Sequence, residues 1–86
     1  MDPYQILKYP VSTEKVVRLM ESDNKLVFIV ERKAKKDDIK KAFEQLFNVK
    51  VIKINTLISP EGKKKAYIKL SKETPAIDIA TQLGLI

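Results

Sequence analysis

The sequence contains no cysteine and no histidine. Without cysteine, a disulfide scaffold, a thiolate nucleophile and a zinc knuckle are excluded. Without histidine, the chain lacks the usual general base near neutral pH and the commonest imidazole metal ligand. Asp37–Asp38 is the only pair of adjacent acidic residues, and neighbouring residues on a helix do not face one another. We therefore expect no enzyme, no metal site and no cofactor.

Signals for export and membrane insertion are also missing. The N-terminal residues Met1–Tyr4 lack the basic and then apolar layout of a signal peptide. No apolar run approaches the ~20 residues that span a bilayer. We expect a cytoplasmic protein without a membrane partner.

The charge balance is the strongest compositional signal. The 86 residues are enough for one small domain, 1–86, and they carry 17 basic against 11 acidic side chains, a net charge of +6. Arg18 and Arg32 are the only arginines, so lysine supplies all the other positive charges. A small surface with this excess favours a polyanionic partner such as nucleic acid.

Apolar periodicity predicts an α/β (α+β) sandwich in which helices pack on a four-stranded sheet. The predicted order is strand, helix, strand, helix, strand, strand, helix. The strands are expected at 6–9, 26–30, 49–58 and 65–70. The first helix is expected between a cap at Ser12 or Thr13 and the turn Ser22–Asn24, and the other two at 37–47 and 75–83.

Local signals refine this prediction. Pro10 places the first strand at a sheet edge, where a missing donor is tolerated. The uninterrupted apolar run Leu26–Val30 indicates a central strand. Imperfect alternation around Ile52–Lys53 indicates a bulge, and Thr74 is expected to cap the last helix. Lys40 and Glu44 have the spacing of a helical ion pair.

The segment Glu61–Lys69 is the most informative candidate site. Lys63, Lys64 and Lys65 follow a turn in which Glu61 is the only local acid, so their charge favours phosphate. Tyr67 lies between Lys65 and Lys69 on the face away from the core, where its ring can stack on a base. An edge strand that lysines protect from aggregation explains the same pattern equally well.

Two further basic clusters and one polar pair complete the candidates. Arg32, Lys33, Lys35 and Lys36 precede the long helix, and Lys15 with Arg18 is expected near Lys8 and Tyr9. Charge runs in bends are usually solvated, so solvation explains the first cluster better than phosphate binding does. Asn55 and Thr56 interrupt an apolar strand. They either satisfy each other or the backbone at a bulge, or face a partner that can bond a 2′-hydroxyl group.

Several segments in order resemble the ribosomal protein L23 family of the large subunit. These segments are Pro10–Lys15, Ala34–Glu44, Leu46–Val51, Ile54–Leu57 and Gly62–Leu70. The likeness extends from about Ile6 to Gly84. Unlike bacterial members, this chain joins its last two strands almost directly at Ser59–Gly62, which resembles the compact archaeal form.

The resemblance implies a largely antiparallel sheet and a structural role in the large ribosomal subunit, bound to ribosomal RNA beside the peptide exit tunnel. It also implies a neighbour of the L29 family and docking of the signal recognition particle or other nascent-chain factors. The RNA-facing positions that it implies are Lys15, Asn55, Thr56, Lys63, Lys64, Lys65, Tyr67 and Lys69. Glu14 matches an exposed carboxylate that would serve factor docking.

Composition leaves two other functions open. A free-standing nucleic-acid-binding module would show the same basic excess, and so would a small adaptor that binds an acidic protein. Sedimentation with large ribosomal subunits would separate the ribosomal role from both.

Overall fold

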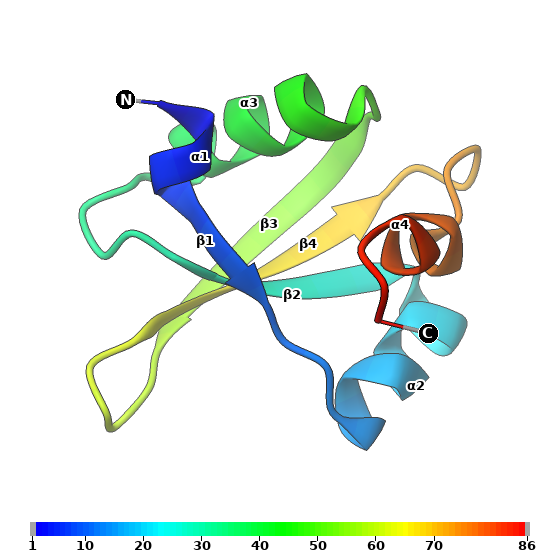
Figure 1. Cartoon of the computed structure of the whole chain (residues 1–86), viewed down its shortest axis with the longest axis horizontal. Coiled ribbons are helices and arrows are strands. Elements are labelled where there is room, and N and C mark those ends of the chain that lie inside the picture. Colours follow the sequence, from blue (N-terminus) through cyan, green and yellow to red (C-terminus); the bar gives the residue numbers. More distant parts are fainter. Residues whose placement is uncertain (1, 86) are drawn as a thin grey trace.

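The computed structural model describes residues 2–85, which form a four-stranded antiparallel sheet with packed helices (Figure 1). The strands are β1 (Leu7–Pro10), β2 (Lys25–Val30), β3 (Val51–Ile58) and β4 (Lys64–Leu70). The helices are α1 (Pro3–Ile6), α2 (Glu14–Asp23), α3 (Lys36–Phe47) and α4 (Ala76–Gln82). From β1 to α4 the element order is the predicted one, and the fold class is confirmed.

The strands lie in the order β1, β2, β4, β3, so β2 and β4 are central while β1 and β3 form the edges. Both the edge position of β1 and the central position of β2 are therefore confirmed. The five residues Leu26–Val30 are all buried. The predicted bulge is also present, because the pairing of β3 with β4 shifts between Val51 and Lys53. This shift leaves Ile52 exposed while Val51 is buried.

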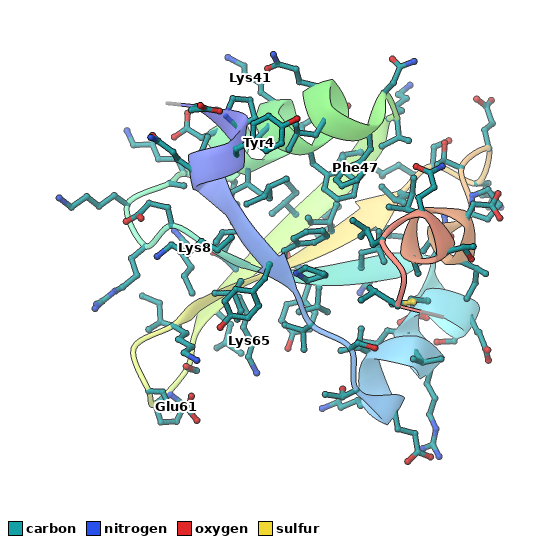
Figure 2. All side chains as sticks on the ribbon, viewed as in Figure 1. Tyr4, Lys8, Lys41, Phe47, Glu61 and Lys65 are labelled. Atoms are coloured by element: carbon teal, nitrogen blue, oxygen red, sulfur yellow. The ribbon has the colours of Figure 1, made fainter. Side chains whose placement is uncertain are left out.

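Three phenylalanines join α3 to one face of the sheet. The Phe28 ring on β2 lies 5.6 Å from the ring centroid of Phe43 and 6.3 Å from that of Phe47. The apolar residues of β4 that pair with this part of β2, Ala66 and Ile68, share the buried face. Figure 2 shows Phe47 between α3 and the strands. The helical spacing of the apolar residues thus produces the core that holds α3 in place.

The N-terminal helix α1 is absent from the sequence prediction. Asp2 caps it, since its carboxylate accepts a hydrogen bond from the Tyr4 backbone N–H at 2.9 Å. Pro3 takes the first helical position, where its missing N–H group costs nothing. This pair of residues is a recognisable helix start, but one turn of helix is too short to show apolar periodicity.

The start of α4 differs from the prediction. The N-cap residue is Pro75, and no side chain within the helix start caps it, so the expected cap by Thr74 is wrong. Asn24, at the end of α2, takes this role from across the fold. Its Oδ1 accepts a hydrogen bond from the Ala76 N–H at 2.6 Å, and its Nδ2 donates to the Leu70, Ser71 and Thr74 carbonyl oxygens.

The expected Lys40–Glu44 ion pair is also wrong. Among residues 2–85, the ion pairs within 4.0 Å are Lys8–Glu31 and Arg18–Glu14. Glu44 instead accepts a hydrogen bond from the Val51 N–H at 3.0 Å, where β3 begins. A carboxylate that satisfies a backbone donor there helps to fix the start of the strand.

Candidate nucleic-acid interface

The loop 31–35 and the turn 59–63 lie side by side at one end of the sheet. Lys64 Nζ donates a hydrogen bond to the Ala34 carbonyl at 2.6 Å, and a weaker one to the Arg32 carbonyl at 3.4 Å. The Arg32 guanidinium lies against Gly62, where an added Cβ would be 3.7 Å from Nη1. We call this region, made of Tyr9, the loop 31–35 and the turn with Lys63, the basic end.

Within the basic end, Tyr9 of β1 contacts Lys63 of the turn. The Lys63 ammonium lies 6.0 Å from the centroid of the Tyr9 ring, and the Tyr9 side chain is 45% exposed. The pKa of Lys63 is raised, first by a hydrogen bond to the Tyr9 side chain and electrostatic attraction to it, and then by the charge of Glu61. Lys63 is therefore fully charged at neutral pH and presented to solvent. Figure 2 shows Glu61 at the tip of the turn.

The three consecutive lysines do not act alike. Lys63 is exposed, whereas Lys64 is partly buried and its ammonium is held by backbone carbonyls. Lys65 lies on the opposite face of β4 from Lys64 because side chains alternate along a strand. It pairs with Ile29 on β2 and Leu57 on β3. The sequence pattern predicts one patch, whereas in the structure Lys63 is exposed, Lys64 is held by backbone carbonyls, and Lys65 is partly buried on the opposite face of β4.

The remaining predicted residues divide between two regions. The cluster before α3, formed by Arg32, Lys33, Lys35 and Lys36, is exposed at the basic end. Lys8 is paired with Glu31 of the same loop, with 3.6 Å between Nζ and Oε2. Lys15 and Arg18 lie on α2, which Figure 1 shows well away from the turn between β3 and β4, and their predicted grouping with Lys8 and Tyr9 stays a prediction.

Glu14, the predicted factor-docking residue, already has a partner. Its Oε1 accepts a hydrogen bond from Arg18 Nη2 at 2.7 Å, one helical turn away. Both side chains are highly exposed, so the pair is open to competition from solvent and from other molecules.

Strand pairing places Tyr67 in the middle of the second face of the sheet. Val27 lies opposite it on β2 and Asn55 opposite it on β3, and residues directly opposite in antiparallel strands share a face. Tyr67 is partly buried, while Asn55 is exposed. The predicted alternation of β4 is confirmed, since Ala66, Ile68 and Leu70 form its buried side.

Asn55 and Thr56 do not form a unit. Thr56 pairs with Ala66 and therefore lies on the helix-covered face, opposite to that of Asn55. The bulge is at 51–53, and within residues 2–85 neither side chain makes a hydrogen bond to another protein group. The interpretation that the two satisfy each other or the backbone at a bulge is wrong, and only Asn55 faces the same surface as Tyr67.

Sequence reasoning missed two basic residues on this face. Lys25 on β2 and Lys53 on β3 both lie directly opposite Lys69 on β4. In the chain, Lys25 lies 28 positions before Lys53, and Lys53 lies 16 positions before Lys69. No local pattern predicts this grouping, because it arises only from the register of three strands.

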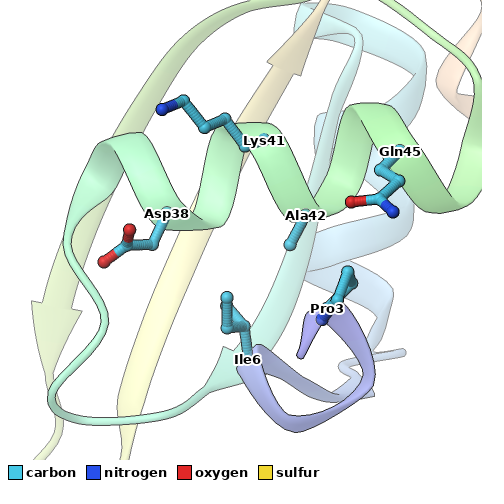
Figure 3. Close-up of a pocket in the computed structure, with 6 residues that line it drawn as sticks. All are labelled: Pro3, Ile6, Asp38, Lys41, Ala42 and Gln45. Carbon is cyan, nitrogen blue, oxygen red and sulfur yellow. The ribbon is translucent and has the colours of Figure 1, made fainter. Parts of the chain in front are cut away.

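A pocket of about 210 Å³ lies between α1 and α3 (Figure 3). Its walls are Pro3, Ile6, Asp38, Lys41, Ala42 and Gln45. One carboxylate and one ammonium contribute to it, and no group of three metal-ligating side chains occurs within residues 2–85. We attribute the pocket to imperfect packing of a one-turn helix on α3 and not to a site for chemistry. None of the helices in residues 2–85 has the length and apolar character needed to cross a membrane.

Comparison with known proteins agrees with the resemblance seen in the sequence. Residues 5–79 match the family model described as ribosomal protein L23. The chain is 52% identical over 85 residues to the large ribosomal subunit protein uL23 of Methanococcus vannielii, and 49% identical to that of Methanococcus aeolicus. Each alignment covers 99% of this chain and 99% of the relative. The expected likeness to the compact archaeal form is confirmed.

Proposed function

Because this chain belongs to the ribosomal protein L23 family, we propose that it anchors itself to large-subunit ribosomal RNA through the basic end. As a member of that family it is a structural component of the ribosome and not an enzyme. The observation that supports the proposal is the convergence of Arg32, Lys63 and the exposed lysines of the loop 31–35 on one surface. None of these cations is in an ion pair within 4.0 Å in the described chain.

The chemistry of the basic end fits phosphate better than it fits a base edge. Lysine presents a mobile point charge, whereas arginine presents the rigid fork that reads guanine or grips a phosphate with two bonds. Each ammonium that neutralises a phosphate releases condensed counterions, and this release drives binding. The basic end would therefore position the protein on a folded RNA without reading its sequence.

We also propose where the chain lies in the large subunit and which proteins it contacts. The family resemblance supports a position beside the peptide exit tunnel, next to a protein of the L29 family, with docking of the signal recognition particle or other nascent-chain factors. Glu14 is the carboxylate that we propose for docking. A factor would have to displace Arg18 or accept the Glu14–Arg18 pair as a unit. The direct turn at Ser59–Gly62 gives no extension that could reach into a tunnel.

Salt-dependent binding tests the basic end. We expect the full chain to bind a large-subunit ribosomal RNA transcript with an affinity that falls steeply as salt rises. The double variant Lys33→Gln with Lys63→Gln should reduce the slope of log affinity against log salt by about 2, close to 1 for each phosphate contact. Lys64 is left intact because its ammonium bonds the loop.

The matched control is Lys40→Gln with Lys41→Gln, which removes the same charge from the exposed side of α3. It should leave the slope near that of the unmodified chain. Equal slopes in the two double variants would reject the basic end as the RNA contact. Failure of the unmodified, tagged protein to sediment with large ribosomal subunits at high salt would reject the ribosomal RNA assignment itself.

A further inference from the structure

The two edges of the sheet are protected to different extents. The edge strand β1 has four residues, ends in Pro10 and has an irregular register with β2. The edge strand β3 has eight residues and contains no proline, and beyond the bulge at 51–53 its pairing with β4 is regular. Its last five residues, Ile54–Ile58, also carry no charge. Short length, proline, bulges and charge are the usual means by which an edge strand avoids pairing with another chain, and this part of β3 has none of them.

Alternate residues of β3 direct their backbone groups away from the sheet. The Ser59 N–H donates a hydrogen bond to the Lys63 carbonyl at 2.8 Å across the turn, so this pair is a hydrogen-bonded one. Hydrogen-bonded and non-hydrogen-bonded pairs alternate along an antiparallel ladder, so the residues of β3 that bond β4 are Lys53, Asn55 and Leu57. The residues whose N–H and C=O groups point to the open edge are Ile54, Thr56 and Ile58. Among residues 2–85, no group of another element bonds these six edge groups.

Apolar side chains flank this open edge on both faces of the sheet. Leu57 is 53% exposed and Ile58 is 52% exposed. Because side chains alternate along a strand, Leu57 lies on the face that contains Asn55, and Ile58 lies on the helix-covered face with Thr56. A strand placed against β3 would remove part of both side chains from water, which is favourable.

The charge beside the edge is positive on the face that contains Asn55. Lys53 is exposed on this face, and Lys69 lies directly opposite it on β4. Neither lysine forms an ion pair within 4.0 Å in the described chain. An added strand would lie about 5 Å from β3, so a carboxylate on this face of it would be within reach of Lys53. Opposite charges in neighbouring positions of two strands are stabilising.

We propose that the edge of β3 from Ile54 to Ile58 binds an extended segment of another protein, which adds a further strand to the sheet. The backbone of the segment pairs with the free groups of Ile54, Thr56 and Ile58 and supplies most of the affinity. Its apolar residues lie on the helix-covered side, and its carboxylates lie beside Lys53. The inference does not rest on the anchoring of the chain to RNA.

The chemistry of the edge favours this occupant over two others. A second copy of the chain has the same net charge of +6, so two copies repel each other. A nucleic acid has no row of alternating donors and acceptors at the spacing of a strand, and it gains little from Leu57 and Ile58. An acidic and apolar polypeptide matches the backbone groups, the apolar side chains and the lysine together.

Amide hydrogen exchange in the isotope-labelled full chain tests the edge residue by residue. The probe is an end-blocked peptide of about seven residues in which valine alternates with glutamate. In the free chain, the N–H groups of Ile54, Thr56 and Ile58 should exchange faster than those of Asn55 and Leu57, which bond β4. With the peptide at about ten times its dissociation constant, exchange at the first three should slow about tenfold. Exchange at the other two should change much less.

A substitution at Thr56 and a second peptide supply the controls. Thr56→Pro removes an outward N–H and no bond to β4, and it should weaken peptide binding about tenfold or more. Thr56→Val keeps that N–H and should bind like the unmodified chain. A peptide of the same composition, with its valines and glutamates in two separate blocks, has the same charge and should bind about tenfold more weakly.

Equal binding of the two peptides would overturn the proposal, because charge alone would then explain the affinity. Peptide binding without slower exchange at Ile54, Thr56 and Ile58 would overturn it too. Slower exchange caused by the ribosomal RNA transcript would assign the edge to RNA, and slower exchange caused by raising the concentration of the chain alone would assign it to a second copy. Each of these two results also rejects the proposal. If Thr56→Pro does not fold, the exchange measurement on the unmodified chain decides.

Discussion

The two ends of the sheet use polar groups in opposite ways. Around Asn24, at the junction of α2 with the segment before α4, one side chain makes four hydrogen bonds to backbone groups. At the basic end, the side chains of Arg32 and Lys63 are exposed, and of the three turn lysines only Lys64 donates to backbone carbonyls in the described chain. The partly buried Asn24 side chain stabilises the fold, whereas the exposed Arg32 and Lys63 side chains are accessible to a partner.

This difference has a physical basis in the size of the protein. A domain of this length buries a modest fraction of its surface, so its stability depends strongly on each buried polar group being satisfied. Exposed charges contribute little to the free energy of unfolding. They can therefore be concentrated on one surface without unfolding the chain. Three pairs of substitutions test whether these polar groups contribute to stability or to binding.

The largest effect is expected at Asn24. Both Asn24 and Asn48 end helices in the left-handed conformation, with φ of 55° and 53°. Asn24→Ala should lower the free energy of unfolding by about 2–4 kcal/mol, since it removes the cap of α4 and leaves backbone groups unpaired as well as straining the backbone. Asn48→Ala should cost only about 1 kcal/mol, from the backbone alone. Urea unfolding measures both, and equal losses would show that the cap across the fold adds nothing.

The next effect is expected at Tyr67, between the two ends. Tyr67→Leu should weaken binding to the ribosomal RNA transcript by about 1–3 kcal/mol if the ring stacks on a base. Tyr67→Phe keeps the ring and should bind within about 0.5 kcal/mol of the unmodified chain. Fluorescence anisotropy with a labelled transcript compares the two variants. Unchanged affinity in Tyr67→Leu would assign the ring to sheet packing only.

The smallest effect separates two neighbours at the basic end. Lys64→Met removes the hydrogen bond to the Ala34 carbonyl and should lower the free energy of unfolding by about 1 kcal/mol. Lys63→Met removes an exposed charge and should change it by less than about 0.5 kcal/mol. Thermal unfolding at fixed salt is sufficient to distinguish them. If Lys63→Met proved equally costly, the contact with Tyr9 would be structural and Lys63 would belong with Lys64.

Much of the fold could be predicted because its signals are local. The Thr13 hydroxyl accepts a hydrogen bond from the Val16 N–H, as a residue in that position before a helix does. The apolar run Leu26–Val30 is as buried as its composition predicts. The candidate site was predicted less well. Strand alternation separates Asn55 from Thr56, but the irregular start of β3 obscured which face each residue takes.

By itself, the sequence determined the class of fold, the order of the main elements and the net positive charge that favours a polyanionic partner. These follow from periodicity, helix starts and net charge, which depend on residues close together in the chain. Only the tertiary structure decided that Asn24 caps α4, that Lys64 holds the loop 31–35, and that Lys25 and Lys53 flank Lys69. Each of these contacts joins residues far apart in sequence, and strand register and packing alone bring them within hydrogen-bonding or electrostatic range.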